Sequence, residues 1–320
     1  MKQLERQELD RENLRAGIVS ALGAYVMWGV LPLYWKGLQT VPALELLSHR
    51  IFWACWFGLA LVVLGKNVRS FGREVRILAA ERSKAALQVI AALLLSVNWL
   101  VYIWAVNQGR IVECSLGYYI NPLFSILLGI VFLGERLSFW QSVAVGLAGV
   151  GVANLTLQFG GVPWVALSLA ASFGFYGLCK KKIQVSAVTG TVIETILVMP
   201  AAVAYLAWLA LTEQGAWNLT DIRTSLLLAG TGVVTAVPLI LFARGANYLP
   251  LKMLGFIQYL SPSISLCIGV FLYKETFTAV HAFSFGCIWL ALVLVSLAGT
   301  KPLQRWEERL NQKVWGGKRC

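Results

Sequence analysis

A histidine and an arginine stand side by side in an otherwise apolar stretch, residues 46–56, LLSHRIFWACW. A histidine titrates near neutral pH and can relay protons, whereas an arginine stays charged and binds anions through its planar donors. Glu45 precedes His49 by four residues, so these two share a helix face, and Arg50 points about 100° away from it. The stretch therefore combines a candidate proton-carrying or ion-pairing couple with a candidate anion-binding group. A hydrogen-bonded packing role is the alternative for His49.

The other residues able to do chemistry form no catalytic or metal-binding pattern. There are two histidines and six cysteines, and no CxxC, Cys/His or HExxH spacing occurs. A Walker A motif, a dinucleotide-binding loop and a Ser/His/Asp signature are also missing from the sequence. We therefore predict no enzyme activity, no cofactor and no metal. An intramembrane enzyme or a sensor remains the alternative.

The composition indicates that Arg50 lies in a membrane-spanning segment. Of the 320 residues, 58% are hydrophobic and only 13% are charged, whereas soluble domains have about 25% charged residues. A helix needs about 20 apolar residues to cross a bilayer. Ten such runs occur, at residues 17–35, 43–65, 84–106, 112–133, 138–156, 162–180, 188–211, 224–243, 252–273 and 279–298. Because the runs are continuous rather than alternating, we predict an all-α integral membrane protein and no β-barrel.

Lysines and arginines alternate between the two sides of this predicted bundle. With the N-terminus in the cytoplasm, the cytoplasmic segments hold 22 of the 27 basic residues. The opposite loops hold only Lys36, Arg110, Arg223 and Lys274. The positive-inside rule therefore predicts that both termini are cytoplasmic. The same bias accounts for the net charge of +12 without a nucleic-acid partner, which would need a clustered basic surface.

The second half of the chain repeats the first. At an offset of 140 residues, six identical pairs occur between residues 119–146 and 259–286: Tyr119/Tyr259, Pro122/Pro262, Ser125/Ser265, Gly129/Gly269, Glu135/Glu275 and Gly146/Gly286. The predicted fold is therefore ten transmembrane helices in two five-helix repeats. Since five is odd, the repeats are inverted. This architecture is typical of secondary transporters, with a channel as the alternative.

Short motifs also carry a resemblance to a known family. They are Trp28-Gly29, Ser48-His49-Arg50, Asn98-Trp99 with Tyr102, Gly117-Tyr118-Tyr119-Ile120-Asn121-Pro122, Gly134-Glu135-Arg136-Leu137-Ser138, Ser261-Pro262 and Lys274-Glu275. Over about residues 14–298 the chain resembles the EamA-type transporters of the drug/metabolite transporter superfamily, most closely the RarD-type (chloramphenicol-sensitivity) subfamily. The resemblance implies two EamA repeats, a bacterial inner membrane location and carrier-type transport of a small metabolite or drug. It implies no particular substrate.

The depth of Arg50 makes it the first candidate for substrate binding. It lies seven residues into its predicted helix, roughly 10 Å below the outer edge of a core about 30 Å thick. Charged groups at that depth usually face the bundle interior or a wet cavity. Pairing with a protein carboxylate and snorkelling to the surface are the alternatives. A cavity position would favour an anionic or zwitterionic ligand.

Two prolines at matching positions predict helix breaks near the binding region. Pro122 cannot donate to the carbonyl of Tyr118, and Pro262 cannot donate to that of Gln258. Such freed carbonyls are tolerated only inside protein or beside water, although kinks needed only for packing would look the same. Polar neighbours complete the predicted substrate-binding set, namely His49, Arg50, Asn98, Tyr102, Tyr118, Tyr119, Asn121, Gln258 and Tyr259.

Three intramembrane glutamates are candidates for proton transfer or for pairing with Arg50: Glu45, Glu113 and Glu194. We expect Glu135 and Glu275 to stabilise helix starts. Gly146 and Gly149 predict close helix contacts, within the fold or in a homodimer.

The predicted organisation is a cytoplasmic segment (1–16), a first repeat (17–156), a second repeat (162–298) and a basic cytoplasmic tail (299–320). The predicted function is alternating-access transport of a small molecule across the bilayer. The sequence leaves open whether a proton gradient or the substrate's own gradient drives it.

Overall fold

The computed structural model describes residues 2–108, 110–158, 162–218, 221–273 and 278–298, together with Leu303. Within these ranges the chain is all-helical, as predicted. Glu275 and the remainder of the predicted tail lie outside the described residues. The helices are α1 (Lys2–Lys36), α2 (Ala43–Leu64), α3 (Val68–Ala80), α4 (Arg82–Asn107), α5 (Ile111–Leu133), α6 (Phe139–Gln158), α7 (Trp164–Ile183), α8 (Ala187–Leu211), α9 (Ile222–Tyr248), α10 (Leu251–Gln258), α11 (Leu260–Cys267), a π-helical turn η1 (Ile268–Leu272), and α12 (Ala279–Ala298).

Each of the ten predicted runs corresponds to one helical segment, with α10, α11 and η1 together forming the ninth. Nine of the segments in the described part of the chain are long and apolar enough to cross a membrane. The exception is α7, whose last turn carries Lys180, Lys181 and Lys182. Because α7 packs against α4, α5 and α9, protein rather than lipid surrounds much of it, and its surface can be less apolar.

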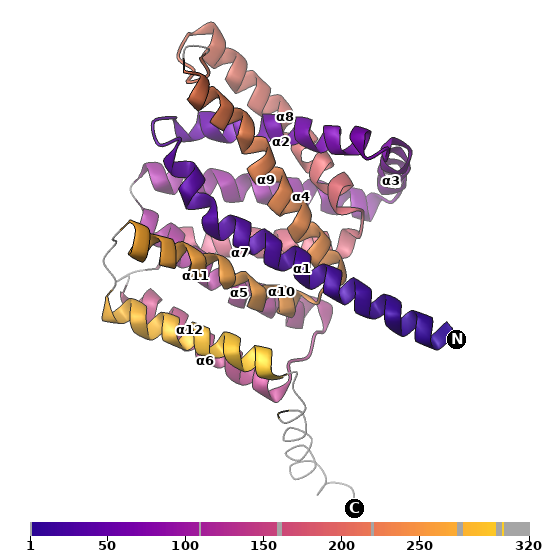
Figure 1. Cartoon of the computed structure of the whole chain (residues 1–320), viewed down its shortest axis with the longest axis vertical. Coiled ribbons are helices and arrows are strands. Elements are labelled where there is room, and N and C mark those ends of the chain that lie inside the picture. Colours follow the sequence, from indigo (N-terminus) through magenta and orange to yellow (C-terminus); the bar gives the residue numbers. More distant parts are fainter. Residues whose placement is uncertain are drawn as a thin grey trace, which may run out of the picture.

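The packing of the helices shows the inverted repeat directly. The first repeat consists of α1, α2, α4, α5 and α6, and its counterparts are α7, α8, α9, α10–α11 and α12. Helix α1 packs against α9 and α11, and its counterpart α7 packs against α4 and α5. The pairs α2–α8, α5–α10 and α6–α12 join counterparts, and α6 and α12 lie side by side at the lower edge of Figure 1. The two halves therefore interlock rather than fold as separate bundles.

A carboxylate joins the repeats at the start of α10. Glu135 accepts hydrogen bonds from the backbone nitrogens of Leu251 (2.6 Å) and Lys252 (2.8 Å). These nitrogens are free at a helix start, where the helix dipole also favours a negative charge. Glu135 thus has the structural role predicted for it, but it caps a helix of the other repeat.

Helix α3 was not predicted, because it is too short to span a membrane and mixes polar with apolar residues. It lies at the same end of the bundle as the start of α1 (Figure 1), and this end is called the α3 end below. Leu78 is buried in the largest apolar cluster. Glu74 accepts a hydrogen bond from the backbone nitrogen of Ser186, between α7 and α8, at 3.2 Å.

The predicted close contacts of glycine occur at other positions. A Cβ atom on Gly146 or Gly149 would meet nothing within 4 Å among the described residues. On Gly232 of α9, by contrast, a Cβ atom would lie 2.5 Å from the backbone carbonyl of Trp53 in α2. The close contact between α2 and α9 is therefore possible only because Gly232 has no Cβ atom.

We predict that Gly232→Ala lowers the stability of the protein by about 1–3 kcal/mol, because the new methyl group forces two packed helices apart. The measurement is the melting temperature of the purified protein in detergent. Gly146→Ala is the matched control, and it should leave the melting temperature unchanged or raise it slightly, since alanine favours a helix over glycine. Equal effects of the two variants would contradict the prediction.

Candidate functional site

A cavity of about 250 Å³ lies between the two repeats. Its walls come from α1, α2, α4 and α5 of the first repeat and from α7, α9, α10 and α11 of the second. Seven residues predicted to bind substrate line it: Arg50, Asn98, Tyr102, Tyr118, Tyr119, Asn121 and Gln258. Residues far apart in the sequence, chosen for their polarity within apolar runs, thus come together in one space.

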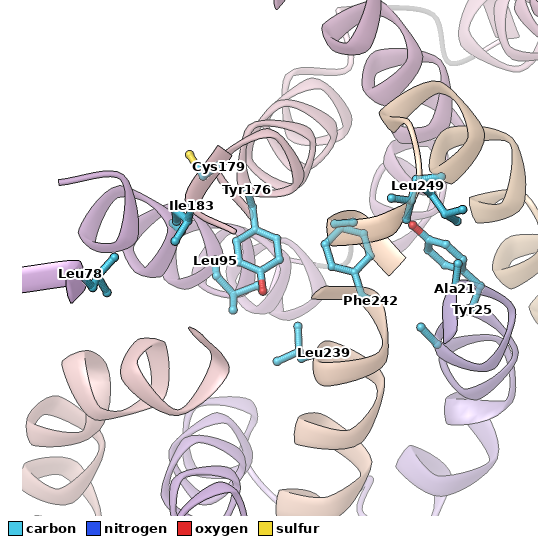
Figure 2. Close-up of a cluster of buried hydrophobic side chains, with 14 residues drawn as sticks. Ala21, Tyr25, Leu78, Leu95, Tyr176, Cys179, Ile183, Leu239, Phe242 and Leu249 are labelled. Atoms are coloured by element: carbon cyan, nitrogen blue, oxygen red, sulfur yellow. The ribbon is translucent and has the colours of Figure 1, made fainter. Parts of the chain in front are cut away.

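The cavity is closed towards the α3 end. Near the opposite end its walls include exposed residues, Ser115 and Tyr118, and Tyr118 is 47% exposed. Deeper in the bundle the wall residues Leu239 and Gln258 are buried. This side of the cavity borders a cluster of buried apolar side chains, the α3-end cluster, which shares Tyr25, Leu95 and Leu239 with the cavity wall. The cluster comprises Ala21, Ala24, Tyr25, Leu78, Ala91, Leu95, Tyr176, Cys179, Ile183, Leu239, Phe242, Ala246, Leu249 and Leu254 (Figure 2).

Arg50 is held in the cavity by aromatic rings and a hydroxyl group. Its Nε donates a hydrogen bond to Oγ1 of Thr235 at 3.1 Å. The guanidinium carbon lies 4.9 Å from the ring centre of Trp35 and 5.3 Å from that of Trp99. Cation–π contacts of this kind contribute about 0.5–2 kcal/mol each. These contacts fix the position of the charge without neutralising it.

None of the three predicted carboxylate partners pairs with Arg50. Within the described ranges, no carboxylate oxygen lies within 4.0 Å of its guanidinium group. Glu113 instead pairs with Arg110 at 2.8 Å and accepts a hydrogen bond from the backbone nitrogen of Val165 at 2.9 Å. It therefore ties the start of α5 to the start of α7.

Glu45 and His49 lie outside the cavity wall, towards the α8–α9 connection. Glu45 accepts a hydrogen bond from the backbone nitrogen of Ala216 at 2.6 Å, and its carboxylate lies 3.8 Å from Nε2 of His49. The ring of His49 stacks on Trp217, with ring centres 5.5 Å apart. The two residues share a face, as predicted from their spacing, and that face holds the connecting segment in place.

Asn98 contacts both the protein and the cavity. Its Nδ2 donates to the carbonyl oxygen of Leu169 (3.0 Å) and to Oγ of Ser172 (2.9 Å). These bonds join α4 to α7, while Asn98 also forms part of the cavity wall. One turn further along α4, the ring of Tyr102 lies 6.1 Å from that of Tyr118.

The two prolines differ in their effect on the backbone. Helix α5 continues through Pro122 without a break, whereas the second repeat is interrupted at Tyr259, between α10 and α11. The break predicted at Pro122 therefore does not occur: α5 is packed against both α7 and α10, and this contact keeps it helical despite the missing hydrogen bond. A Cβ atom on Gly255 would lie 2.7 Å from the carbonyl oxygen of Pro122, so α10 approaches α5 closely at this point.

Tyr259 and Glu194 are buried away from the cavity. Tyr259 packs in a second apolar cluster with Ile126, Phe256 and Ile288. Glu194 lies beyond the closed end of the cavity, where its carboxylate is 2.8 Å from Nζ of Lys180. Pro262, in contrast, lines the cavity together with Ser261.

Several residues of the cavity wall were not in the predicted set. They are mostly aromatic and include Tyr25, Trp28, Trp35, Trp99 and Phe173, together with Thr235. The aromatic residues were missed because tryptophan and tyrosine also anchor helices at membrane interfaces. Nothing in the sequence distinguishes Thr235, because its hydrogen bond is to Arg50 on a different helix. Across the described part of the chain, no three His, Cys, Asp or Glu side chains gather as a metal-ligand set.

Two interlocked inverted repeats around a cavity inside a membrane-spanning bundle are typical of a membrane transporter. The model of the EamA-like transporter family matches residues 15–157 and again residues 161–297. The chain therefore belongs to the EamA-like transporter family and is a multi-pass membrane protein. The match confirms the predictions of transport and of no enzyme activity.

Curated relatives cover almost the whole chain. An "Uncharacterized transporter" of Vibrio cholerae is 46% identical over 91% of this chain and 95% of its own length. The "Protein RarD" of Salmonella typhimurium is 41% identical over 89% of this chain and 96% of its own. The "Chloramphenicol-sensitive protein RarD" of Pseudomonas aeruginosa is 30% identical, over 92% and 97%. The resemblance to RarD-type proteins is thereby confirmed.

The fold also matches a solved structure. A crystal structure with 18% sequence identity superposes with a TM-score of 0.66, over 90% of this chain and 99% of the other. At this identity the match shows the fold alone.

We predict that a cysteine in place of Ser115 reacts rapidly with a hydrophilic thiol reagent, because Ser115 is exposed in the cavity wall. The experiment uses full-length protein in which the native cysteines are replaced by serine, and it measures the rate of labelling. Leu116→Cys is the matched control, since Leu116 is the next residue and is only 5% exposed. It should react at least about tenfold more slowly, because a buried thiol is not accessible to the reagent. Equal rates would show that the cavity does not open at this end.

Proposed function

We propose that this transporter is a secondary carrier for a small anionic or zwitterionic metabolite or drug, which binds in the cavity between the repeats. The observation that carries the proposal is the charge of Arg50, which is oriented by Trp35, Trp99 and Thr235 but has no carboxylate within 4.0 Å in the described residues. A cation in a low-dielectric cavity is stabilised by an anion more strongly than it would be in water. A carboxylate, phosphate or similar group of the substrate would supply that anion.

The rest of the cavity suits an amphipathic molecule. Aromatic rings of Trp28, Tyr102 and Phe173 line it, and they can cover an apolar body. Asn121 and Gln258 add amide groups on the side away from the exposed end, and both are buried. The side-chain oxygen of Asn121 has no hydrogen-bond partner among the described residues. A polar group on the substrate would satisfy it.

Alternating access fits this arrangement better than a channel does. The cavity ends against the α3-end cluster, so among the described residues no continuous path crosses the bundle. Inverted repeats open to either side by rocking one part against the other around a fixed site. The driving force is a proton gradient or the gradient of the substrate itself.

The proposed setting is the bacterial inner membrane with both termini in the cytoplasm. The distribution of lysine and arginine supports this orientation, and it makes the α3 end cytoplasmic. A homodimer is compatible with the open positions at Gly146 and Gly149.

We predict that Arg50→Leu strongly weakens substrate binding and transport. The test begins with a thermal-shift screen of metabolites and antibiotics on the purified protein, including chloramphenicol because of the name of one relative. Each compound that raises the melting temperature is then tested for binding and for uptake into liposomes. Loss of charged hydrogen bonds, each worth about 1.5–3 kcal/mol, should weaken binding by at least about tenfold. Arg50→Lys should be intermediate, since lysine keeps the charge but loses the planar fork.

Arg223→Leu is the control for this experiment. Arg223 is an exposed cation in the first turn of α9 and does not line the cavity. Its removal should leave binding within about twofold of the parent. Full transport by Arg50→Leu would remove Arg50 from the mechanism.

Thr235→Val tests whether the orientation of Arg50 matters. The change removes the hydroxyl group that accepts from Nε but keeps the shape of the side chain. We expect binding of anionic compounds to weaken by about 3–10-fold, because one hydrogen bond contributes about 0.5–1.5 kcal/mol. Thr231→Val, one turn earlier on α9, is the matched control, since among the described residues this buried hydroxyl bonds to its own helix, at the carbonyl of Leu228. Isothermal titration should show normal binding for the control, and an equal loss in both variants would contradict the role of Thr235.

A further inference from the structure

A buried ion pair lies at the α3 end of the bundle, outside the cavity. Nζ of Lys180 on α7 is 2.8 Å from Oε1 of Glu194 on α8, and the two side chains are only 4% and 1% exposed. Burying two charges costs free energy unless they are paired and hydrogen-bonded. The pair is therefore stable only while α7 and α8 stay together at this end.

Two neutral side chains complete the coordination of Glu194. The hydroxyl of Tyr176 donates to Oε2 at 3.1 Å, and Nε2 of Gln88 donates to Oε1 at 3.2 Å. Gln88 also donates to the carbonyl oxygen of Gly190 at 2.8 Å. The cluster of Gln88, Tyr176, Lys180 and Glu194, called the lock below, therefore links α4, α7 and α8. A break in any one contact leaves polar groups buried without a partner.

The lock lies directly behind the closed end of the cavity. On α7, Phe173 lines the cavity, Tyr176 follows about one turn later, and Lys180 follows one turn after that. The ring of Tyr176 stacks on Phe242, with centres 5.7 Å apart and planes at 17°, and Figure 2 shows the two rings beside Leu95 and Leu239. Tyr176 thus belongs both to the apolar barrier and to the lock.

The inverted repeat relates the lock to Arg50. Glu194 is the eighth residue of α8, and Arg50 is the eighth residue of its counterpart α2. The two charges therefore lie equally far along counterpart helices that start on opposite sides of the membrane. The one on the closed side is paired, and the one at the accessible cavity has no carboxylate partner in the described residues. In inverted-repeat carriers the two sides exchange their open and closed arrangements.

We propose that the lock holds the α3 end of the transporter closed and separates each time the cavity opens on that side. This inference rests on the proposed alternating access but not on the charge of the substrate. Lys180 and Glu194 are positioning residues: they act through the barrier and do not touch the cargo.

The test measures the accessibility of the two sides of the barrier without any substrate. Cys179, next to Lys180, is buried in the α3-end cluster and serves as a natural reporter for this end. One set of full-length variants keeps only Cys179, with the other five cysteines replaced by serine. A second set has Ser115→Cys alone and reports the opposite end. A hydrophilic maleimide is added to protein reconstituted in nanodiscs, and labelling rates are compared.

In Glu194→Gln and in Lys180→Met, labelling of Cys179 should rise at least about tenfold, and labelling at position 115 should fall at least about threefold. A rise at Cys179 together with a fall at position 115 distinguishes a lock from a contact that only stabilises the α3 end. Simple loosening of the α3 end would raise the Cys179 rate and leave the rate at position 115 unchanged, and this result would overturn the proposal. Unchanged rates at both positions would also overturn it.

Three further variants keep the test decisive. Lys182→Met is the matched control, because Lys182 is an exposed lysine in the same turn, and its rates should equal those of the parent. Exchange of the charges, Lys180→Glu with Glu194→Lys, should return both rates towards parental values. If the single variants do not fold, Tyr176→Phe carries the test. It removes only the hydroxyl that bonds to Glu194, and it should shift both rates in the same directions by at least about twofold.

The proposal on substrate charge fails independently of this one. Suppose that the lock variants raise labelling of Cys179 and lower labelling at position 115, while Arg50→Leu still transports fully. The lock would then be supported and the anion site excluded. If Arg50→Leu loses the binding of anions and the lock variants show no opposite changes in labelling, the anion site would be supported and the lock excluded.

Discussion

Inside a bilayer, a charged or hydrogen-bonding group has to find its partner within the protein, because lipid offers none. Each of three buried glutamates has at least one such partner, and these contacts help to hold the helices together. Glu113 joins α5 to α7, Glu45 holds the α8–α9 connection, and Glu194 links α4, α7 and α8. Arg50 departs from the pattern because the groups around it are aromatic rings and a hydroxyl.

The kind of contact made by Arg50 decides what the cavity can do. A carboxylate at 2.8 Å would have cancelled most of its charge and closed the space beside it. Tryptophan rings instead attract the guanidinium through their faces and leave its net charge intact. The protein thus orients the cation before a ligand arrives, which reduces the cost of ordering it on binding. Under the proposal made above, such a site would attract an anion, and the aromatic rings with the amides of Asn121 and Gln258 would contact the remainder of the molecule.

The fold could be predicted from the sequence because membrane spans depend on local composition, and the repeat could be recognised because Tyr119, Pro122 and Gly146 recur at a fixed offset. Rotation around a single helix also follows from spacing, which is why Glu45 and His49 share a face. Contacts between helices do not follow from spacing. The partners of Arg50 and Glu194, namely Thr235 and Lys180, come from other helices at distances of 185 and 14 residues along the chain. The unbroken α5 at Pro122 likewise depends on neighbours that the sequence does not identify.

The interlocked packing constrains how the two sides can alternate. Since α1 packs on α9 and α11, and α7 packs on α4 and α5, neither repeat can move as a body without displacing helices of the other. A motion that keeps these contacts between the repeats has to separate other helices, at places where few side chains join them. It does so at one end of the bundle at a time. A cluster that binds α4, α7 and α8 together at the α3 end prevents separation there. On the counterpart helix α2, the residue equally far from the helix start is Arg50, whose partners leave room for a ligand. An anion bound there would provide at the opposite end the charge pairing that Lys180 and Glu194 already make at the α3 end, and it could thereby favour closure around the cargo.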